Sequence, residues 1–187
     1  MYVREAKKRE EVWLLDQLEA FGFDDPAFRS RDYVIAVDED AGERVGFGRV
    51  RTHGGESPYC EVTSLGVRED WRGRGFGAAI VQKLLALADE QDCGAVYVFT
   101  EQTGYLEQFG FEGLEEDALT DQQRERLDVV RETIESEAVA MVVDVDEFSV
   151  PRRLARRFES DEEAPEERPE DFGIDPDTAT YKYDTGR

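Results

Sequence analysis

The sequence predicts an α/β (α+β) domain with a mixed central sheet, the element order β-α-β-β-β-α-β-α-β and helices on both faces. Two observations support this class. Short apolar segments rich in valine and aromatic residues alternate with longer segments whose apolar residues recur at helical spacing, and a glycine-rich turn joins one of these strands to a helix. A chain of 187 residues is also long enough to bury one complete hydrophobic core.

The first half of the chain predicts a strand, a helix and a three-stranded antiparallel meander. The opening strand spans residues 2–5. Apolar residues at helical spacing then predict a helix that ends at Gly22, since glycine tolerates the left-handed conformation of a helix C-terminus. The meander strands are expected over 33–37, 44–52 and 60–67, separated by polar turn residues.

The second half begins with a helix over 78–87, whose first turn lies near Gly75. Shorter elements follow it. In order, they are a strand over 95–100, a short helix over 105–109, an extended piece from Phe111, a helix over 119–134 with an N-cap at Thr120 or Asp121, and an apolar strand over 138–145.

The predicted domain covers residues 1–146, and two further segments follow it. Residues 147–158 form a short helix with four arginines, which either folds back onto an acidic surface or grips a phosphate or an acidic acceptor. Residues 159–187 hold eleven acidic residues against three basic ones, so we expect a largely irregular acidic tail.

The composition is strongly acidic, with a formal net charge of −22 and a pI near 4.3. A field of this sign repels phosphate, which argues against nucleic acid and anionic membranes as partners. The sequence has no apolar run of bilayer length and no signal peptide at its start, so a cytoplasmic location is expected.

Lysine is scarce, with only four lysines among the 23 basic residues. An excess of acid with little lysine resembles proteins from halophiles, whose molar cytoplasmic salt screens charge repulsion within about 3 Å. The acidic residues are spread along the whole chain, which favours this interpretation over an acidic surface that docks a basic partner. Two cysteines, Cys60 and Cys93, have no metal-ligand spacing and are expected to be reduced and structural.

The most informative segment is the turn from Trp71 to Gly77, which follows a strand and opens a helix. Gly73, Gly75 and Gly77 lack β-carbons, so a pyrophosphate can approach several consecutive backbone N–H groups. The helix adds the positive end of its dipole, and Arg72 and Arg74 add full charges. The segment is expected to form a phosphate cradle of backbone amides.

Other interpretations of this turn exist. Gly73-x-Gly75-x-x-Ala78 also fits a dinucleotide-binding fingerprint, with Glu101 at the end of the next strand as the ribose-binding acid. The polar stretch 68–72 argues against it, because the dinucleotide turn follows its strand directly. A P-loop is excluded, since no Gly-Lys-Ser/Thr ends the run. The remaining alternative is a glycine-rich turn that only begins a helix.

Arg72-x-x-Gly75-x-Gly77 resembles the acyl-CoA-binding signature of the GCN5-related N-acetyltransferase (GNAT) family. A second segment, Tyr105 to Phe111, resembles the aromatic-aromatic-Glu-x-x-Gly-Phe segment that closes the acetyl-CoA site in that family. The two motifs occur in the family's order, and the resemblance covers roughly residues 2–145. It implies the GNAT fold, N-acetyltransferase activity and acetyl-CoA as co-substrate, with no metal.

In the family, the strand before the phosphate turn splays from its neighbour and leaves backbone groups free to pair with the pantetheine arm. The matching residues here imply that the Leu65 amide polarises the thioester carbonyl. Together with the turn, the implied cofactor-binding set is Leu65, Gly66, Val67, Arg72, Gly73, Arg74, Gly75, Phe76, Gly77 and Ala78.

Glu61 is the best candidate for the general base, because an alkylamine with a pKa near 10 must lose a proton before it attacks. Glu61 precedes Leu65 by four residues in one strand, which predicts that both side chains share a face, and it matches the catalytic glutamate of related histone acetyltransferases. A carboxyl in an otherwise apolar sheet holds a proton more tightly than one in water. Glu56 and His53 are weaker candidates, and Glu61 could instead be a solvated acid on an open sheet face.

Leu106 stands where the family often has a tyrosine that acts as the general acid. Tyr105 is one residue away, about 100° around a helix, so packing in the core or against pantetheine is expected rather than proton donation.

The spacing of Leu106, Phe109 and Phe111 is similar to that in small acetyltransferases related to N-acetylglutamate synthases. That likeness implies a small-molecule amine such as an amino acid as acceptor. A non-catalytic acyl-CoA-binding module remains the alternative, and a homodimer through the late strand and the C-terminal segment is compatible with the sequence.

Overall fold

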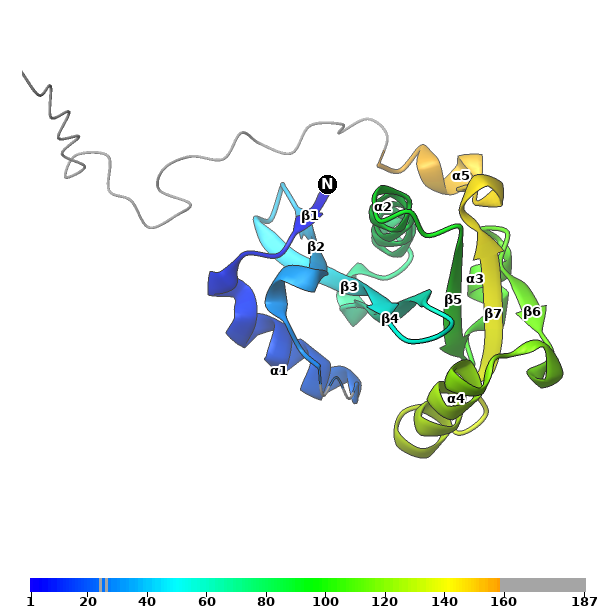
Figure 1. Ribbon diagram of the computed structural model, residues 1–187. Helices are drawn as coiled ribbons and strands as arrows, with labels where there is room; N and C mark the ends of the chain where they lie inside the picture. The colour runs from blue at the N-terminus through cyan, green and yellow to red at the C-terminus, as the bar shows by residue number, and fades with distance from the viewer. Residues whose placement is uncertain (24, 26, 159–187) are drawn as a thin grey trace, which may run out of the picture.

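The computed structural model describes residues 1–23, 25 and 27–158 (Figure 1). A seven-stranded sheet forms its centre, with the strand order β1-β2-β3-β4-β5-β7-β6. All neighbouring strands are antiparallel except β4 and β5. The strands are β1 (Tyr2–Glu5), β2 (Tyr33–Asp38), β3 (Glu43–His53), β4 (Tyr59–Val67), β5 (Ala95–Thr100), β6 (Glu112–Leu114) and β7 (Val139–Asp144).

Helices cover both faces of the sheet, as predicted (Figure 1). Alternate residues of β2 show why: Val34 and Ala36 pack in the cluster that contains α2, whereas Ile35 packs in the cluster that contains α1. A third cluster holds α4 against β5 and β7. The helices are α1 (Glu11–Phe21), α2 (Phe76–Glu90), α3 (Thr103–Glu107), α4 (Asp121–Thr133) and α5 (Arg152–Ala155).

The elements expected along the chain occur in the expected order. The extended piece expected from Phe111 is β6, a three-residue strand that pairs with β7 at the sheet edge, so the structure has one strand and one helix more before β7 than the β-α-β-β-β-α-β-α-β order. The predicted helix ends also hold. Gly22 is left-handed at the end of α1, with a φ of 71°, and the Thr120 side chain accepts a hydrogen bond from the Gln123 amide at the start of α4.

The sheet topology rules out the dinucleotide-binding interpretation. A Rossmann unit is built from successive parallel strand pairs, whereas only one pair of this sheet is parallel. The acidic tail predicted for 159–187 lies outside the described residues. None of the helices among the described residues combines the length and the hydropathy that a bilayer-spanning segment needs.

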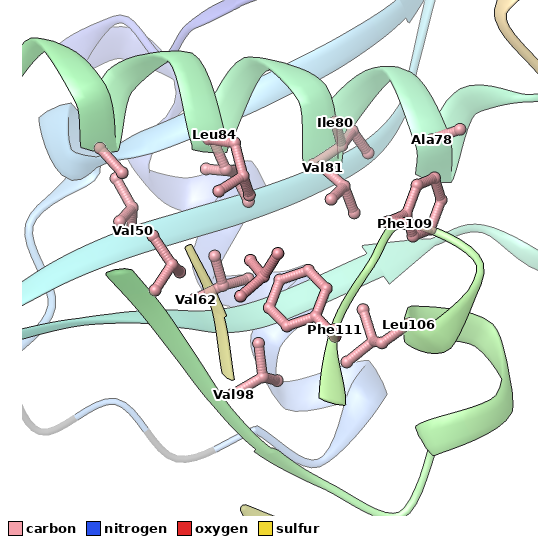
Figure 2. Close-up of a cluster of buried hydrophobic side chains, with 14 of the residues drawn as sticks. Val50, Val62, Ala78, Ile80, Val81, Leu84, Val98, Leu106, Phe109 and Phe111 are labelled. Carbon is pink, nitrogen blue, oxygen red and sulfur yellow. The ribbon is translucent and has the colours of Figure 1, made fainter. Parts of the chain in front are cut away.

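The largest cluster of buried side chains fixes the helix that follows the glycine turn (Figure 2). Ile80 and Leu84 of α2 are fully buried, and Figure 2 shows them over Val50 of β3 and Val62 of β4. Phe109 and Phe111 close the cluster from the segment after α3. This packing holds the first turn of α2 rigidly beside the end of β4.

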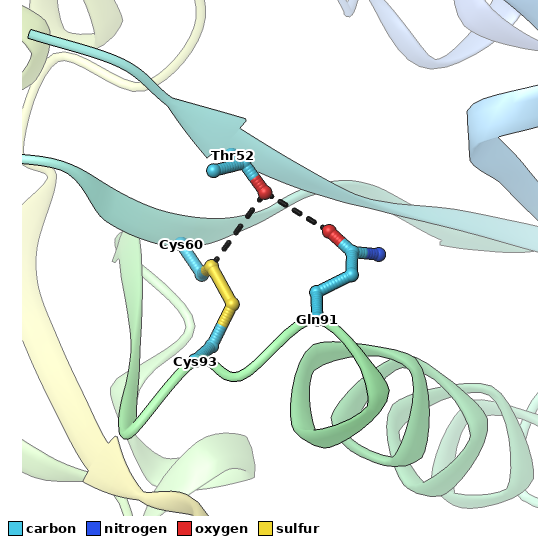
Figure 3. Close-up of a disulfide and its surroundings, with 4 residues drawn as sticks. All are labelled: Thr52, Cys60, Gln91 and Cys93. Atoms are coloured by element: carbon cyan, nitrogen blue, oxygen red, sulfur yellow. Dashed lines mark hydrogen bonds between the residues drawn. A yellow bond between two sulfur atoms is a disulfide. The ribbon is translucent and has the colours of Figure 1, made fainter.

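The expectation of two reduced cysteines is wrong. Cys60 at the start of β4 and Cys93 after α2 form a disulfide, with their Cα atoms 6.2 Å apart (Figure 3). Thr52 of the neighbouring strand hydrogen-bonds to Gln91 and lies 3.7 Å from the Cys60 sulfur. No local sequence signal indicates this pairing, because the two residues are brought together only when α2 packs across the sheet.

Candidate active site

The parallel pair β4 and β5 separates along its length, as expected from the family resemblance. The two strands pair at two positions only, Cys60 with Val96 and Glu61 with Tyr97. Beyond Glu61, the edge of β4 that faces β5 therefore has no strand partner in the described structure. A free strand edge presents backbone N–H and C=O groups that a ligand can pair with.

A β-bulge lies in this free part of β4. Phe47 of β3 pairs with Gly66 and Arg49 pairs with Thr63, so β4 has one residue more than β3 between the two pairs. Ser64 takes up the extra length with a φ of 53°. The bulge shifts the alternation of side chains, and Leu65 packs in the cluster under α2 while Glu61 faces α4.

The expectation that Glu61 and Leu65 share a face is therefore wrong, because the bulge at Ser64 reverses the alternation between them. Gly66 has a packing reason of its own. A β-carbon at Gly66 would lie 2.7 Å from the Phe47 ring, so no larger residue fits there.

The glycine turn has the backbone conformation that a cradle requires. Gly73 and Gly75 have φ values of 73° and 100°, which favour glycine, and Gly75 is the N-cap of α2. Phe76 and Ala78 are buried in the core, so only their backbone faces the turn. The 15-residue α2 begins here with its N–H groups unsatisfied by the helix itself.

The two arginines of the turn behave differently. Arg72 donates from Nε to the carbonyl of Val67 at 3.1 Å, which ties the turn to the end of β4. The Arg74 guanidinium lies over the Trp71 ring, 4.6 Å from its centre, and Arg74 is not among the cavity-lining residues of the described chain. Arg72 lines the cavity.

A single cavity of about 950 Å³ joins the glycine turn to Glu61. Its turn end is lined by Arg72, Gly73, Gly75, Gly77, Tyr105 and three residues of the C-terminal segment, Arg153, Leu154 and Arg157. Its middle follows the free edge of β4 from Val62 to Val67. Its other end is lined by Phe21, Phe23, Asp25, Arg51, Glu61, Thr63, Arg126 and Glu135.

Glu61 is buried, with 2% of its surface exposed, but its surroundings are charged rather than apolar. Arg126 of α4 donates from Nε to both carboxylate oxygens at 3.0 and 3.1 Å. His53 Nε2 lies 2.6 Å from the carboxylate, and the His53 ring stacks on Tyr59. In the tautomer that carries its proton on Nε2, His53 donates to this carboxylate.

Burial opposes the charged form of Arg126, but its hydrogen bonds to Glu61 and the attraction of that carboxylate outweigh burial and hold the pKa of Arg126 above its usual range. The Arg126 guanidinium is therefore charged at any physiological pH. Of the weaker base candidates, His53 is a partner of Glu61, and Glu56 is exposed and lies apart from the cavity-lining residues of the described chain.

Tyr105 lines the cavity at the turn end rather than beside Glu61. Its ring packs edge-on against Phe109, and its hydroxyl lies against Gly77. Burial raises the pKa of Tyr105 to about 12, so the phenol is neutral at physiological pH. Leu106 is buried in the core and also borders the cavity.

Sequence reasoning missed the residues that surround Glu61 from other elements. Arg126 lies 65 residues from Glu61 and has no local motif, so only the packing of α4 brings it to the site. Asp25 accepts hydrogen bonds from Arg49 at 2.6 Å and Tyr33 at 2.6 Å, and it borders the cavity near Phe23. The described residues contain no group of three or more His, Cys, Asp or Glu arranged to hold a metal.

Solved structures support the fold assignment. Rv2747 from Mycobacterium tuberculosis, in complex with CoA and NLQ, matches with a TM-score of 0.65 at 22% identity, over 77% of this chain and 99% of that one. N-acetylglutamate synthase from Neisseria gonorrhoeae, complexed with CoA and N-acetyl-glutamate, matches with a TM-score of 0.60 at 17% identity, over 76% of this chain and 34% of that one.

Sequence comparison leads to the same family. An uncharacterized N-acetyltransferase of Chlorobaculum tepidum, CT2212, is 32% identical over 58 residues, which are 31% of this chain and 37% of that protein. Residues 2–111 match the sequence profile of the acetyltransferase (GNAT) family. This match covers more than half of the chain, including the free strand edge, the glycine turn and the Tyr105 segment, and the chain therefore belongs to the GNAT family of acetyltransferases.

Proposed function

We propose that this protein transfers the acetyl group of acetyl-CoA to the primary amine of a small molecule, by direct attack of the amine on the thioester. One observation carries the proposal. A single cavity connects the glycine turn, the free edge of β4 and the buried Glu61, so a donor held at the turn would reach the carboxylate from inside the protein.

The donor half of the cavity has groups for each part of acetyl-CoA. The backbone amides of Gly73 to Ala78 and the start of α2 suit the pyrophosphate. The pantetheine arm would lie along residues 65–67 and pair with the free strand edge. The Leu65 amide would then donate to the thioester carbonyl oxygen, which becomes negative in the tetrahedral intermediate.

The reaction needs a proton acceptor for the amine. In the proposed step the ammonium form of the acceptor loses one proton to Glu61, and the neutral nitrogen forms a bond to the acetyl carbon. The carbon–sulfur bond then breaks to release the CoA thiolate, and the second proton of the nitrogen passes to that thiolate or to water. Arg126 donates to both carboxylate oxygens of Glu61 and so holds this carboxylate in position at the end of the cavity. A thiolate with an ordinary pKa near 8.5 leaves without a dedicated acid, so Tyr105 is not required as a donor.

The acceptor end of the cavity favours an amine that also carries a carboxylate. Arg51 pairs in register with Glu61 across β3 and β4, lines the cavity, and has no hydrogen-bond or ion-pair partner among the described residues. A guanidinium beside the proposed base would bind a carboxylate close to the reacting nitrogen. An amino acid fits this arrangement, and the Neisseria gonorrhoeae neighbour was solved with N-acetyl-glutamate.

Turnover tests the proposal directly. The protein is incubated with acetyl-CoA and a panel of amino acids and plain alkylamines, in molar salt because the acidic composition resembles that of halophilic proteins, and thiol release and acetylated product are both measured. We expect turnover with at least one amino acid and none with the corresponding carboxamide. CoA binding without turnover across the panel would instead support the non-catalytic module, and no CoA binding at all would refute both.

A further inference from the structure

The C-terminal helix α5 lies at the turn end of the cavity, outside the segment that matches the family profile. Leu154 and Ala155 are buried, and Leu154 packs in the core cluster that contains α2. All four arginines of this segment are exposed, but only Arg153 and Arg157, four residues apart, line the cavity, and Arg152 and Arg156 do not. The buried pair thus holds two of the four arginines at the cavity and leaves the other two outside.

Arg157 lies directly on the glycine turn. Its guanidinium donates to the carbonyl of Gly73, and its Cβ is 3.0 Å from the place a β-carbon would take on Gly75. The Gly73 carbonyl uses one of the five guanidinium donors, so others remain for a ligand. The absence of a side chain at Gly75 is what allows Arg157 to approach this closely.

Arg153 is held by a different part of the chain. It donates to the Gln108 side chain at 2.6 Å, and Gln108 in turn donates to the Tyr105 carbonyl at 2.7 Å. These contacts connect α5 to the segment that follows α3. Arg72, Arg153 and Arg157 therefore surround the turn from two separate parts of the chain.

The charge distribution of the cavity points to an anion at this end. The acidic residues that line it among the described residues are Asp25, Glu61 and Glu135, and they belong to the end with Glu61. The turn end of the cavity is thus lined by three arginines and by no acidic residue among the described residues. Its local charge is positive, although the chain has a net charge of −22. Phosphate groups are typically bound by guanidinium groups and backbone amides acting together.

We infer that Arg157 and Arg153 bind phosphate oxygens at the nucleotide end of acyl-CoA, with Arg157 on the pyrophosphate above the glycine turn. This inference rests on the proposed function, because it assumes that acyl-CoA occupies the cavity. It assigns a role to the arginine-rich segment, which then completes the cradle from outside the family domain. In strong salt, an arginine held in place by Gly73 and Gln108 retains more of its binding than a mobile one.

Calorimetry with the full-length protein tests the inference. Affinities for CoA, 3′-dephospho-CoA and pantetheine are measured for the wild type, Arg153→Ala and Arg157→Ala, with Arg152→Ala and Arg156→Ala as matched controls. We expect Arg157→Ala to weaken binding of both CoA and dephospho-CoA about tenfold or more, and Arg153→Ala to weaken CoA binding in the same direction. Pantetheine binding should not change, and the controls should stay within about twofold.

Equal CoA affinities in all four variants would overturn the inference. It would also be overturned if Arg157→Ala weakened binding of CoA but not of dephospho-CoA, since that pattern assigns Arg157 to the 3′-phosphate. Thermal unfolding of each variant shows whether α5 is still folded, and Arg157→Lys keeps the charge if the alanine variant is unstable. A wild type that binds no CoA would refute the proposed function instead, so the two failures are distinguishable.

Discussion

The hydroxyl of Tyr105 lies so close to Gly77 that a β-carbon on Gly77 would be 2.5 Å from it. A side chain at position 77 would therefore have to displace the end of the Tyr105 side chain, which packs from α3 against the start of α2. The tyrosine ring is held in turn by its edge-on contact with Phe109.

Gly77→Ala is expected to destabilise the fold by about 1–3 kcal/mol, because the new methyl group forces the Tyr105 side chain to move. Tyr105→Phe removes the clashing oxygen and leaves the ring carbon at an ordinary 3.4 Å, so the double variant should recover most of the lost stability. Urea unfolding of the three variants measures this. Gly94→Ala, which places a β-carbon in open space, is the control, and a Gly77→Ala protein as stable as that control would show that the contact is unimportant.

Glu61→Gln is expected to lower kcat at neutral pH by about 10² to 10⁴, because the amide cannot accept the amine's proton. CoA binding should be nearly unchanged, since the carboxylate lies at the opposite end of the cavity from the turn. Steady-state kinetics and a CoA titration separate the two effects. Glu56→Gln, an exposed acid on the preceding loop, should behave as the wild type. An unchanged rate in Glu61→Gln would remove Glu61 from the proposed role.

Two buried tyrosines should respond oppositely to loss of the hydroxyl. The Tyr59 hydroxyl is buried without a hydrogen-bond partner among the described residues, whereas the Tyr33 hydroxyl donates to Asp25 at 2.6 Å. Tyr59→Phe should therefore be neutral or stabilising, and Tyr33→Phe should cost about 1–3 kcal/mol because it leaves part of the Asp25 carboxylate unpaired. Chemical denaturation at pH 7 compares the two, and equal losses would contradict the assignment.

Alkaline pH should unfold the protein through its tyrosines. Burial raises the pKa of Tyr105 to about 12 and raises the pKa of Tyr33 and Tyr59 further. A tyrosine in the unfolded chain loses its proton near pH 10, while these three keep theirs in the fold, so the stability they contribute is complete below pH 10 and is lost as pH rises toward 12. The free energy of unfolding measured from pH 8 to 11 should fall above pH 10, and less steeply in Tyr59→Phe.

Reduction of the Cys60–Cys93 disulfide should lower the free energy of unfolding by about 3–4 kcal/mol, from the chain entropy of a loop whose ends are 33 residues apart. This loop contains the free strand edge, the glycine turn and α2. Denaturation with and without a thiol reductant measures the effect, and Cys60→Ser/Cys93→Ser should match the reduced protein and ignore the reductant. A wild type insensitive to reductant would show that the bond does not stabilise the protein.

Much of the fold follows from local sequence signals. The strands of the meander, α2 and α4 each carry a period of two or 3.6 in their apolar residues, and Gly22 and Thr120 end or begin helices through their own backbone and side-chain chemistry. The backbone of the glycine turn is also determined locally, because Gly73 and Gly75 set its conformation within a few residues. These features need no contact with distant residues.

The sequence by itself determined the order of elements, the glycine turn and the candidacy of Glu61. Only the tertiary structure decided what surrounds Glu61: the bulge at Ser64 that reverses the strand's alternation, the Arg126 guanidinium from α4, and the separation of β4 from β5 that opens the cavity. Arg157 on the glycine turn and the Cys60–Cys93 bond were decided in the same way. The reason is physical, since periodicity and capping act within a few residues, whereas ion pairs, disulfides and cavities join residues that only packing brings within a few ångströms.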